Sequence, residues 1–273
     1  MSFYGLNEIN KFNGSSSQPN ILVSSLRKYL ILLPNKSEQT AITTALSDAD
    51  AMITSLEKLI EKKRAIKQGA MQELLRPKDG WMVKTLGDIA SIQRGASPRP
   101  IDSPIWFDEN SEIGWVRISD VSSSIKYLFE TTQKLSGQGI KNSRFVQSGE
   151  LIMSICATIG RPILTTFDVC IHDGFVAFYY PKIDKEFLYY YLTFIESEWS
   201  KTGQTGSQMN LNTDIIQSRE IAFPKEPMEQ RAIAETLSVM DTGINLLEQK
   251  LSKYKMIKHG MMQELLTGKT RLV

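Results

Sequence analysis

The sequence has 273 residues, of which 41% are hydrophobic and 23% charged, so it is long and apolar enough to form one or two ordinary cores. Its 32 Lys and Arg residues stand against 30 Asp and Glu residues, a formal net charge of +2. This balance excludes a histone-like polycation and an acidic disordered tail, so a surface that binds nucleic acid has to be a local patch.

Metal and membrane signals are absent from the sequence. Its two cysteines, Cys156 and Cys170, and its two histidines, His172 and His259, lack the spacing of a structural zinc site, so we expect no metal. No N-terminal stretch has the pattern of a signal peptide, and the apolar runs are too short to span a bilayer. We therefore expect a cytoplasmic protein with reduced thiols and no membrane partner.

An internal repeat divides the chain. The segment Glu-Gln-Thr-Ala-Ile at 38–42 returns as Glu-Gln-Arg-Ala-Ile at 229–233. The offset is about 191 residues, and about half of some 40 aligned positions are identical. The similarity extends back to about Gly14, which aligns residues before the first copy with the end of the region between the copies. The predicted parts are the tail of a preceding domain (1–34), a first helix (35–78), one complete domain (79–225) and a second helix (226–273).

Each copy of the repeat predicts a long helix. It follows a proline, has an acidic residue in its first turn and runs for about 35 to 40 residues without a proline. Apolar residues alternate at spacings of three and four, the pattern of a coiled-coil seam. We expect antiparallel pairing within the chain, because a compact domain lies between the copies; pairing with another chain is the alternative. The expected interface residues are Leu46, Ile53, Leu56, Ile60, Leu237, Ile244, Leu247 and Leu251.

The region between the helices reads as a strand-rich domain. Short apolar runs broken by turn-forming residues predict strands at 81–83, 89–92, 114–118, 151–153 and 174–178. Residues 187–199 predict a helix, and the Gly-, Gln-, Ser-, Thr- and Asn-rich segment 201–213 predicts a polar loop. The expected fold class is α+β, with one mixed, strand-rich domain flanked by two long helices that form an antiparallel coiled coil.

Motifs for catalysis are missing. The sequence has no phosphate-binding loop, no Gly-x-Ser-x-Gly nucleophile elbow and no His-Glu-x-x-His zinc helix. His172 and Asp173 suggest a Ser-His-Asp triad, but proximity in sequence is not triad geometry, and a hydrogen-bonded structural histidine is the favoured interpretation. The segment 157–161 has one glycine, which is typical of a tight turn. We expect a binding protein without a cofactor in this chain, not an enzyme.

The predicted loops carry side chains suited to DNA. Arg binds guanine through two hydrogen bonds, Gln and Asn bind adenine, and Lys, Ser and Thr commonly contact phosphates. The alternative is an ordinary solvated surface, which such residues also form. The candidate DNA-binding residues are Arg94, Ser97, Arg99, Arg117, Ser119, Lys126, Arg144, Thr158, Arg161, Gln204, Gln208 and Asn210.

Several motifs resemble those of a known family. They are the Glu-Gln-x-Ala-Ile start of each repeat, the segment 257–269 with its earlier copy, and, within the domain, 85–89 leading to Arg94-Gly95, 115–120 and 210–213. In these motifs, and over nearly its whole length, the chain resembles the specificity (S) subunit of type I restriction-modification systems.

The resemblance implies a non-catalytic subunit that binds double-stranded DNA. S subunits assemble with methyltransferase (M) subunits, which bind S-adenosylmethionine, and often with restriction (R) subunits. They direct adenine methylation to a bipartite sequence: each recognition domain reads one half-site, and the helices set the spacing between half-sites.

The resemblance also shows a departure. Typical S subunits carry two complete recognition domains, whereas this sequence contains one, which implies a half-length form. The favoured interpretation is that such a form makes a homodimer; pairing with another S fragment and a truncated cassette are the alternatives. The alternative function is a non-catalytic coiled-coil interaction protein or restriction inhibitor that binds M or R subunits rather than DNA. The net charge of +2 disfavours a DNA mimic, which needs a strongly acidic surface.

Overall fold

A computed structural model describes residues 27, 33–202 and 211–272 of the chain. It divides into two compact units, of which the first comprises 1–66 and 240–273 and the second comprises 67–239. The expected tail of a preceding domain, 1–34, therefore lies almost wholly outside the described residues. The last turns of the first long helix and the first turns of the second belong to the second unit.

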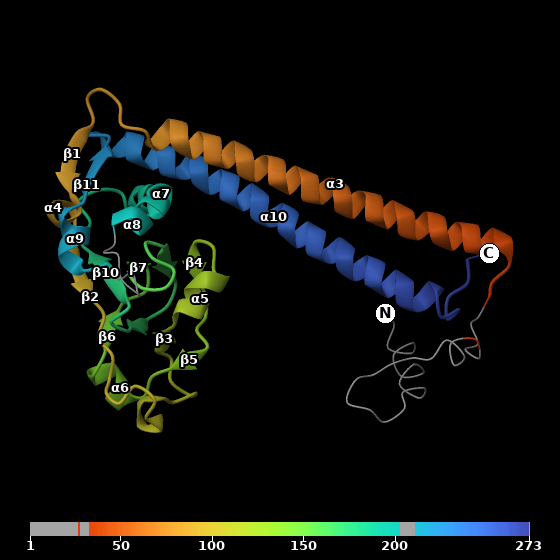
Figure 1. The fold of residues 1–273 in the computed structure, drawn as a ribbon, viewed down its shortest axis with the longest axis horizontal. Helices are drawn as coiled ribbons and strands as arrows, with labels where there is room; N and C mark the ends of the chain where they lie inside the picture. Colours follow the sequence, from red (N-terminus) through yellow and green to blue (C-terminus); the bar gives the residue numbers. More distant parts are fainter. Residues whose placement is uncertain (1–26, 28–32, 203–210, 273) are drawn as a thin grey trace. The chain divides into compact units, whose positions relative to one another are not determined.

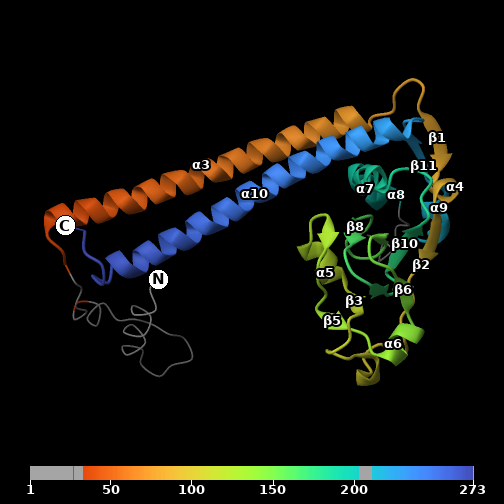
Figure 2. The same cartoon turned by 180° about the vertical axis from the view of Figure 1, so that it is seen from behind.

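The first unit is a pair of long helices. α3 (Lys36–Leu75) and α10 (Pro227–Leu265) run side by side in it (Figures 1 and 2). The Asn35 side chain caps the start of α3, because its Oδ1 accepts a hydrogen bond from the Glu38 N–H at 2.9 Å. Arg271 follows α10, and its guanidinium donates two bonds of 2.6 Å to the Glu38 carboxylate. The end of one helix therefore meets the start of the other, as antiparallel pairing requires.

A seam of buried apolar side chains holds this pair together. Ile53, Leu56 and Ile60 of α3 are at most 9% exposed, and Ile244 of α10 is 8% exposed. Removing a Leu or Ile side chain from water contributes about 1.5–3 kcal/mol, so the seam is the main source of stability. Of the other expected interface residues, Leu46, Leu247 and Leu251 are half-buried, and Leu237 is fully buried within the second unit.

The two flanks of the α3 seam differ in chemistry. Asp50, Glu57 and Arg64 recur at intervals of seven residues, and each pairs with a charged residue of α10. The other flank repeats at the same interval with Met52, Leu59 and Ile66. These three apolar side chains are 41%, 39% and 47% exposed. One flank is therefore closed by ion pairs and the other exposes apolar surface.

The described residues of the second unit form three sheets. β1 (Met82–Thr85) and β11 (Glu220–Phe223) form an antiparallel pair, visible at the edge of the domain in Figure 1. The larger sheets have the strand orders β2-β10-β7-β8-β4 and β5-β3-β9-β6. Their neighbouring strands are antiparallel except β4–β8 and β3–β9. The strands are β2 (Ser91–Arg94), β3 (Gly114–Val116), β4 (Tyr127–Leu128), β5 (Gln133–Lys134), β6 (Arg144–Val146), β7 (Leu151–Ser154), β8 (Pro162–Thr165), β9 (Val169–Ile171) and β10 (Phe175–Tyr179).

Short helices connect these strands. They are α4 (Leu86–Ile89), η1 (Pro104–Trp106), α5 (Ile118–Ser123), α6 (Gly137–Lys141), α7 (Lys185–Phe194), α8 (Glu196–Thr202) and α9 (Thr213–Ser218). α4 replaces the start of the strand expected at 89–92, because Thr85 and Asp88 cap each other's backbone and start a helical turn. The helix expected at 187–199 is split into α7 and α8, since Ile195 ends the first.

The core lies between the two larger sheets. Val116 of β3, Ile171 of β9, Ile152 of β7 and Phe175 of β10 belong to one buried cluster. Trp115 faces the opposite way from Val116 and joins a second cluster, as expected for successive residues of a strand. β7 and β8 are buried along their whole length, so they form the fixed centre of the domain.

The described residues were compared with the requirements for a membrane-spanning helix and for a metal site. No helix among them is both long and apolar enough to cross a membrane. The same residues include no group of three or more His, Cys, Asp or Glu side chains arranged to hold a metal ion.

Candidate functional site

Three loops of the second unit meet at the start of β10. β2 and β7 flank this strand and run antiparallel to it, so both end where it begins: Arg94 pairs with Val176 and Ser154 with Phe175. The chain segments that follow the two strands therefore lie against the turn that precedes β10. We call these segments the arginine loop (94–99), the Thr158 turn (155–161) and the Asp173 turn (172–174).

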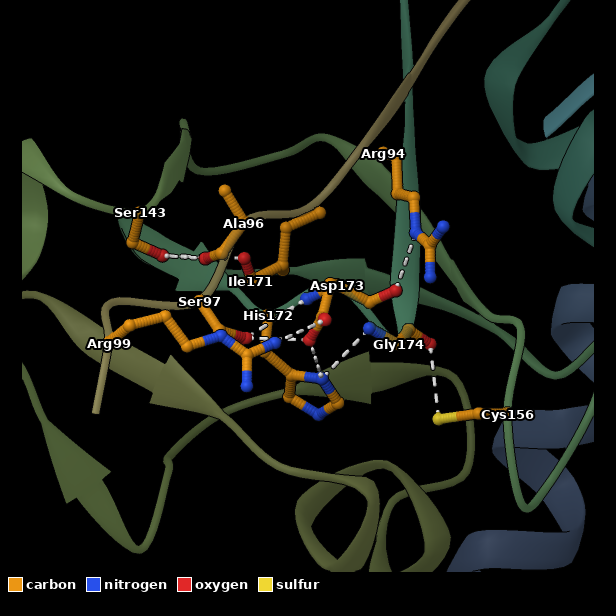
Figure 3. A network of polar contacts seen from close by, with 10 residues as sticks. All are labelled: Arg94, Ala96, Ser97, Arg99, Ser143, Cys156, Ile171, His172, Asp173 and Gly174. Carbon is orange, nitrogen blue, oxygen red and sulfur yellow. Dashed lines mark hydrogen bonds and ion pairs between the residues drawn. The ribbon is translucent and has the colours of Figure 1, made fainter. Parts of the chain in front are cut away.

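The Asp173 turn holds the arginine loop through three side chains (Figure 3). Ser97 Oγ donates to Asp173 Oδ1 at 2.6 Å, and Arg99 Nη2 donates to Asp173 Oδ2 at 3.1 Å. Arg94 Nε donates to the Asp173 backbone carbonyl at 2.8 Å. The Ser97 hydroxyl is the largest cause that lowers the pKa of Asp173, followed by the charge of Arg99. The carboxylate is therefore ionised at neutral pH and binds two side chains of one loop.

The backbones of these loops approach so closely that glycine is required. The N–H groups of Gly95 and Ala96 donate to the carbonyls of Phe175 and Ile171. A Cβ atom on Gly95 would lie 2.0 Å from the His172 carbonyl oxygen, and one on Gly174 would lie 2.4 Å from Cys156 Sγ. Any side chain at either position would push the loops apart.

His172 stabilises the Asp173 turn from its buried side and is not part of a catalytic triad. Its Nδ1 accepts a hydrogen bond from the Gly174 N–H at 2.9 Å, and its ring packs 4.8 Å from the ring of Phe175. Burial lowers its pKa to about 4, so the ring is neutral at neutral pH. Ser97 bonds to Asp173 rather than to His172, so nothing here activates a serine nucleophile. The geometry is that of a structural histidine.

The start of β6 and the residue before it hold the arginine loop from a second side. Ser143 Oγ donates to the Ala96 carbonyl at 2.8 Å, and Arg144 Nε donates to the Arg94 carbonyl at 3.2 Å. Arg94, Arg99 and Arg144 are all exposed, whereas Ser97 is half-buried. Four of the candidate DNA-binding residues are thus brought together around one loop of fixed backbone.

The Thr158 turn forms a second group with α5. Ser122 Oγ and Thr158 Oγ1 are 3.3 Å apart, and Arg161 Nη2 donates to the Ser124 carbonyl at 2.9 Å. Gly160 has a φ of +82°, and a Cβ there would lie 2.2 Å from the Trp199 ring. Thr158 and Arg161 are half-buried, and the turn contacts the Asp173 turn through the Ile155 N–H, which donates to the Gly174 carbonyl.

Two further candidates lie at the end of β3. Arg117 is half-buried: its Nε donates to Gln133 Oε1 at 2.8 Å, and its guanidinium lies 5.8 Å from the Trp115 ring. Ser119 is exposed in the first turn of α5. Arg117 lies close enough to His172 to contribute to the lowering of its pKa. Arg117 therefore lies near the Asp173 turn, and Ser119 belongs to the helix whose Ser122 faces the Thr158 turn.

Lys126 is a correction to the expected DNA surface. The side chain is 5% exposed, and its Nζ donates to Glu186 Oε2 at 2.8 Å, Tyr190 OH at 3.2 Å and Ser238 Oγ at 3.3 Å. Nζ also lies 4.6 Å from the centre of the Tyr190 ring. A buried, fully engaged ammonium group does not reach DNA, so Lys126 instead joins α7 to the first turns of α10 within the second unit.

The remaining candidates, Gln204, Gln208 and Asn210, lie outside the described residues. The described chain resumes at Leu211, which is buried and whose N–H donates to the Ile155 carbonyl of the Thr158 turn at 3.1 Å. Residues that sequence reasoning missed are Asp173 as an anchor of the arginine loop, together with Ser143 and Gln133. Their partners are distant in sequence, so no local pattern marks them.

The chain can now be placed among known proteins. The family model described as type I restriction modification DNA specificity domain matches residues 2–68 and 78–255. The chain therefore belongs to this family. A type I restriction enzyme subunit, the MjaVIII specificity subunit of Methanocaldococcus jannaschii, is 27% identical over 276 residues, which cover 89% of this chain and 62% of the relative.

Solved structures agree with the fold. The HsdS subunit from Thermoanaerobacter tengcongensis matches 97% of this chain and 67% of its own, with 18% identity and a TM-score of 0.60. The S subunit of a type I restriction-modification system from M. genitalium matches 97% and 71%, with 16% identity and a TM-score of 0.59. The chain spans 63% and 62% of the length of two archaeal relatives, less than two thirds of either.

Proposed function

We propose that this chain is the sequence-specific DNA-binding subunit of a type I restriction-modification complex. One observation carries the proposal: in a chain of this family, the exposed Arg94, Arg99 and Arg144 surround one loop whose backbone is fixed by hydrogen bonds. Specific recognition needs donors held in register, because phosphate contacts give position and base contacts give sequence. The subunit itself is non-catalytic and acts in the cytoplasm.

The arginine loop suits double-stranded DNA. A guanidinium donates two parallel hydrogen bonds to O6 and N7 of guanine in the major groove, which discriminates by about 1–3 kcal/mol. Arg99 is 70% exposed although it pairs with Asp173, so its guanidinium is oriented yet accessible. Thr158 and Ser119 supply hydroxyl groups of the kind that bind phosphate. Arg117, Arg161 and the residues 204, 208 and 210 complete the proposed DNA surface.

The catalytic steps belong to partners in this proposal. Methyltransferase subunits bind S-adenosylmethionine and methylate adenine, and restriction subunits cleave; the names of the relatives support such a complex. This chain recognises the DNA sequence at which those subunits act. No cofactor is assigned to it.

A direct test is to map methylation. Cells that lack other adenine methyltransferases would express this chain with the M subunit encoded beside it, and long-read sequencing would locate methylated adenines. The expected result is a new bipartite motif that disappears when the chain is omitted. If the M subunit methylated the same motif when this chain is omitted, the proposal would be contradicted.

A bipartite target needs two recognition domains, and the second unit supplies one. We propose that a second copy of the chain supplies the other, with Met52, Leu59 and Ile66 of α3 as part of the contact. These residues border the α3–α10 seam, and their interval of seven residues matches a helix-to-helix interface. Two identical readers predict a palindromic motif. An asymmetric motif would instead indicate pairing with another S fragment.

Light scattering of the purified chain tests this pairing. The wild-type chain is expected to have the mass of two copies, and Leu59→Glu is expected to have the mass of one, because a carboxylate would be buried in the contact. Thr54→Glu is the matched control, because it adds the same carboxylate at an exposed position of α3 that is neither three nor four residues from Met52, Leu59 or Ile66. A monomeric wild-type chain, or a dimer that Leu59→Glu leaves intact, would overturn it.

A further inference from the structure

A carboxylate lies at the centre of the proposed DNA surface. Asp173 is 42% exposed and is surrounded by candidate DNA-binding residues, of which Arg99 is 3.1 Å away. An exposed negative charge at this position weakens the attraction of the surface for phosphates. If non-specific attraction to phosphates were the only requirement, an uncharged side chain would serve better. The contacts of Asp173 point to a different role.

Asp173 binds the polar side chains of the arginine loop from one fixed point. Its two carboxylate oxygens accept from Ser97 and Arg99, and its backbone carbonyl accepts from Arg94 (Figure 3). The Asp173 N–H also donates to Ser97 Oγ at 3.4 Å. A long arginine side chain has many rotamers in water, and each bond to a fixed acceptor removes some of this freedom before DNA arrives.

The base on which Asp173 sits is rigid. His172, directly before it, is 13% exposed and packs against Phe175 and Trp115. Gly174, directly after it, allows the backbone to approach within contact of Cys156. The packing of His172 and Gly174 against the domain therefore fixes the position of the Asp173 carboxylate. Through its hydrogen bonds, the carboxylate in turn restricts the side chains of the exposed arginine loop.

We propose that Asp173 is a positioning residue for DNA recognition: it holds Ser97 and Arg99 in the arrangement that reads sequence, and it raises discrimination at the cost of affinity for DNA without the motif. The inference rests on the proposed function. It assigns Asp173 no contact with DNA.

The main test compares Asp173→Asn with Asp102→Asn in the assembled complex. Both variants remove one negative charge, but Asp102 is an exposed residue that takes no part in the bonds to Asp173. The probes are a duplex with the mapped motif and a scrambled duplex. For Asp173→Asn we expect motif affinity to fall about tenfold while scrambled-duplex affinity is unchanged or higher. Asp102→Asn should keep the wild-type ratio. If Asp173→Asn also keeps it, the proposal is wrong.

A double-mutant cycle shows whether Asp173 acts through Arg99. If it does, Asp173→Asn should cost much less discrimination in an Arg99→Ala background than in the wild type, because the side chain being positioned is already gone. Independent, multiplicative losses would mean that Asp173 does not act through Arg99. Arg76→Ala, which removes an exposed arginine outside this surface, serves as the matched background.

A third measurement needs no DNA and therefore separates this inference from the proposed function. Hydrogen exchange of the arginine loop in the free chain should be faster in Asp173→Asn than in the wild type, with exchange in β7 and β8 unchanged. Unchanged exchange in the loop would overturn the positioning role even if a methylation motif is found. The absence of a motif, with faster loop exchange, would instead refute the proposed function alone.

Discussion

In the helix pair, buried apolar side chains form a single line, represented by Ile53, Leu56 and Ile60, whereas in the strand-rich domain they fill both faces of the central strands. The helix pair relies on ion pairs such as Lys255–Glu57 to close one flank. The domain encloses its core with loops whose glycines permit close approach. In the helix pair each stretch therefore depends on a few buried side chains of one seam. The strand-rich domain has a deep core, and its exposed loops can be held in place on that core.

The largest effect is expected from the core of the domain. Phe178 is fully buried in β10, and Phe178→Ala should lower the free energy of unfolding by about 3–5 kcal/mol, because it removes an aromatic ring and leaves a cavity. All four tryptophans lie between residues 67 and 239, so tryptophan fluorescence in urea follows this unit. Val83→Ala, at a position 60% exposed, is the control and should change stability by less than about 0.5 kcal/mol. If the two changes lowered the free energy of unfolding equally, the assignment of Phe178 to the core would be wrong.

A smaller effect is expected from the seam of the helix pair. Leu56 is 5% exposed, and Leu56→Ala should cost about 2–3 kcal/mol, the lower part of the range for buried leucines, since a two-helix seam can partly collapse around the gap. Thermal unfolding followed by far-UV circular dichroism measures it. Leu246→Ala on α10, at a position 60% exposed, is the matched control. If Leu246→Ala lost more stability than Leu56→Ala, the assignment of the buried seam would be wrong.

The smallest effect concerns pH and the turn beneath the arginine loop. Burial outweighs the nearby Asp173 charge and lowers the pKa of His172 from 6.5 to about 4. Between these values the unfolded chain binds a proton that the folded chain does not, so the stability is full above pH 6.5 and falls as the pH drops toward 4. From pH 7 to pH 5 the loss should be about 2 kcal/mol.

Urea unfolding at both pH values, with His172→Asn as the variant, measures this contribution. Asparagine keeps an oxygen near the position of Nδ1 to accept the Gly174 N–H, but it does not titrate. The variant should therefore be less stable at pH 7 and less sensitive to pH. A variant with the full wild-type pH dependence would show that another group is responsible.

The two regions also differ in how far sequence reasoning reaches. The long helices follow from apolar spacing, because a helix repeats within its own segment. α3 spans nearly the expected range of 35–78, whereas α10 starts one residue after the expected 226 and ends at Leu265, short of the expected 273. Strands such as β7 and β10 were expected from apolar runs, whereas β4 and β5, of two residues each, carry no such pattern. α4 depends on a capping exchange between Thr85 and Asp88 that overrides the apolar run beginning at 89.

The site was harder to predict than the fold. Arg94, Ser97 and Arg99 share a predicted loop that carries side chains suited to DNA, and the structure gives that loop a fixed backbone. Lys126 was misassigned because its partner Glu186 lies 60 residues away, so nothing local marks the lysine as buried. Asp173 lies 76 residues from Ser97, so nothing in its local sequence marks it as an anchor of the arginine loop. Side-chain roles set by distant partners leave no trace in local spacing.

The central claim is that the arginine loop reads DNA sequence. Its most direct test is the dissociation constant of the assembled complex for a duplex with its mapped motif and for a scrambled duplex, with Arg99→Ala against the matched Arg76→Ala. The account predicts that Arg99→Ala weakens binding to the motif by about tenfold or more, leaves binding to the scrambled duplex nearly unchanged, and that Arg76→Ala alters neither. Equal motif affinities for the wild type and Arg99→Ala would contradict it.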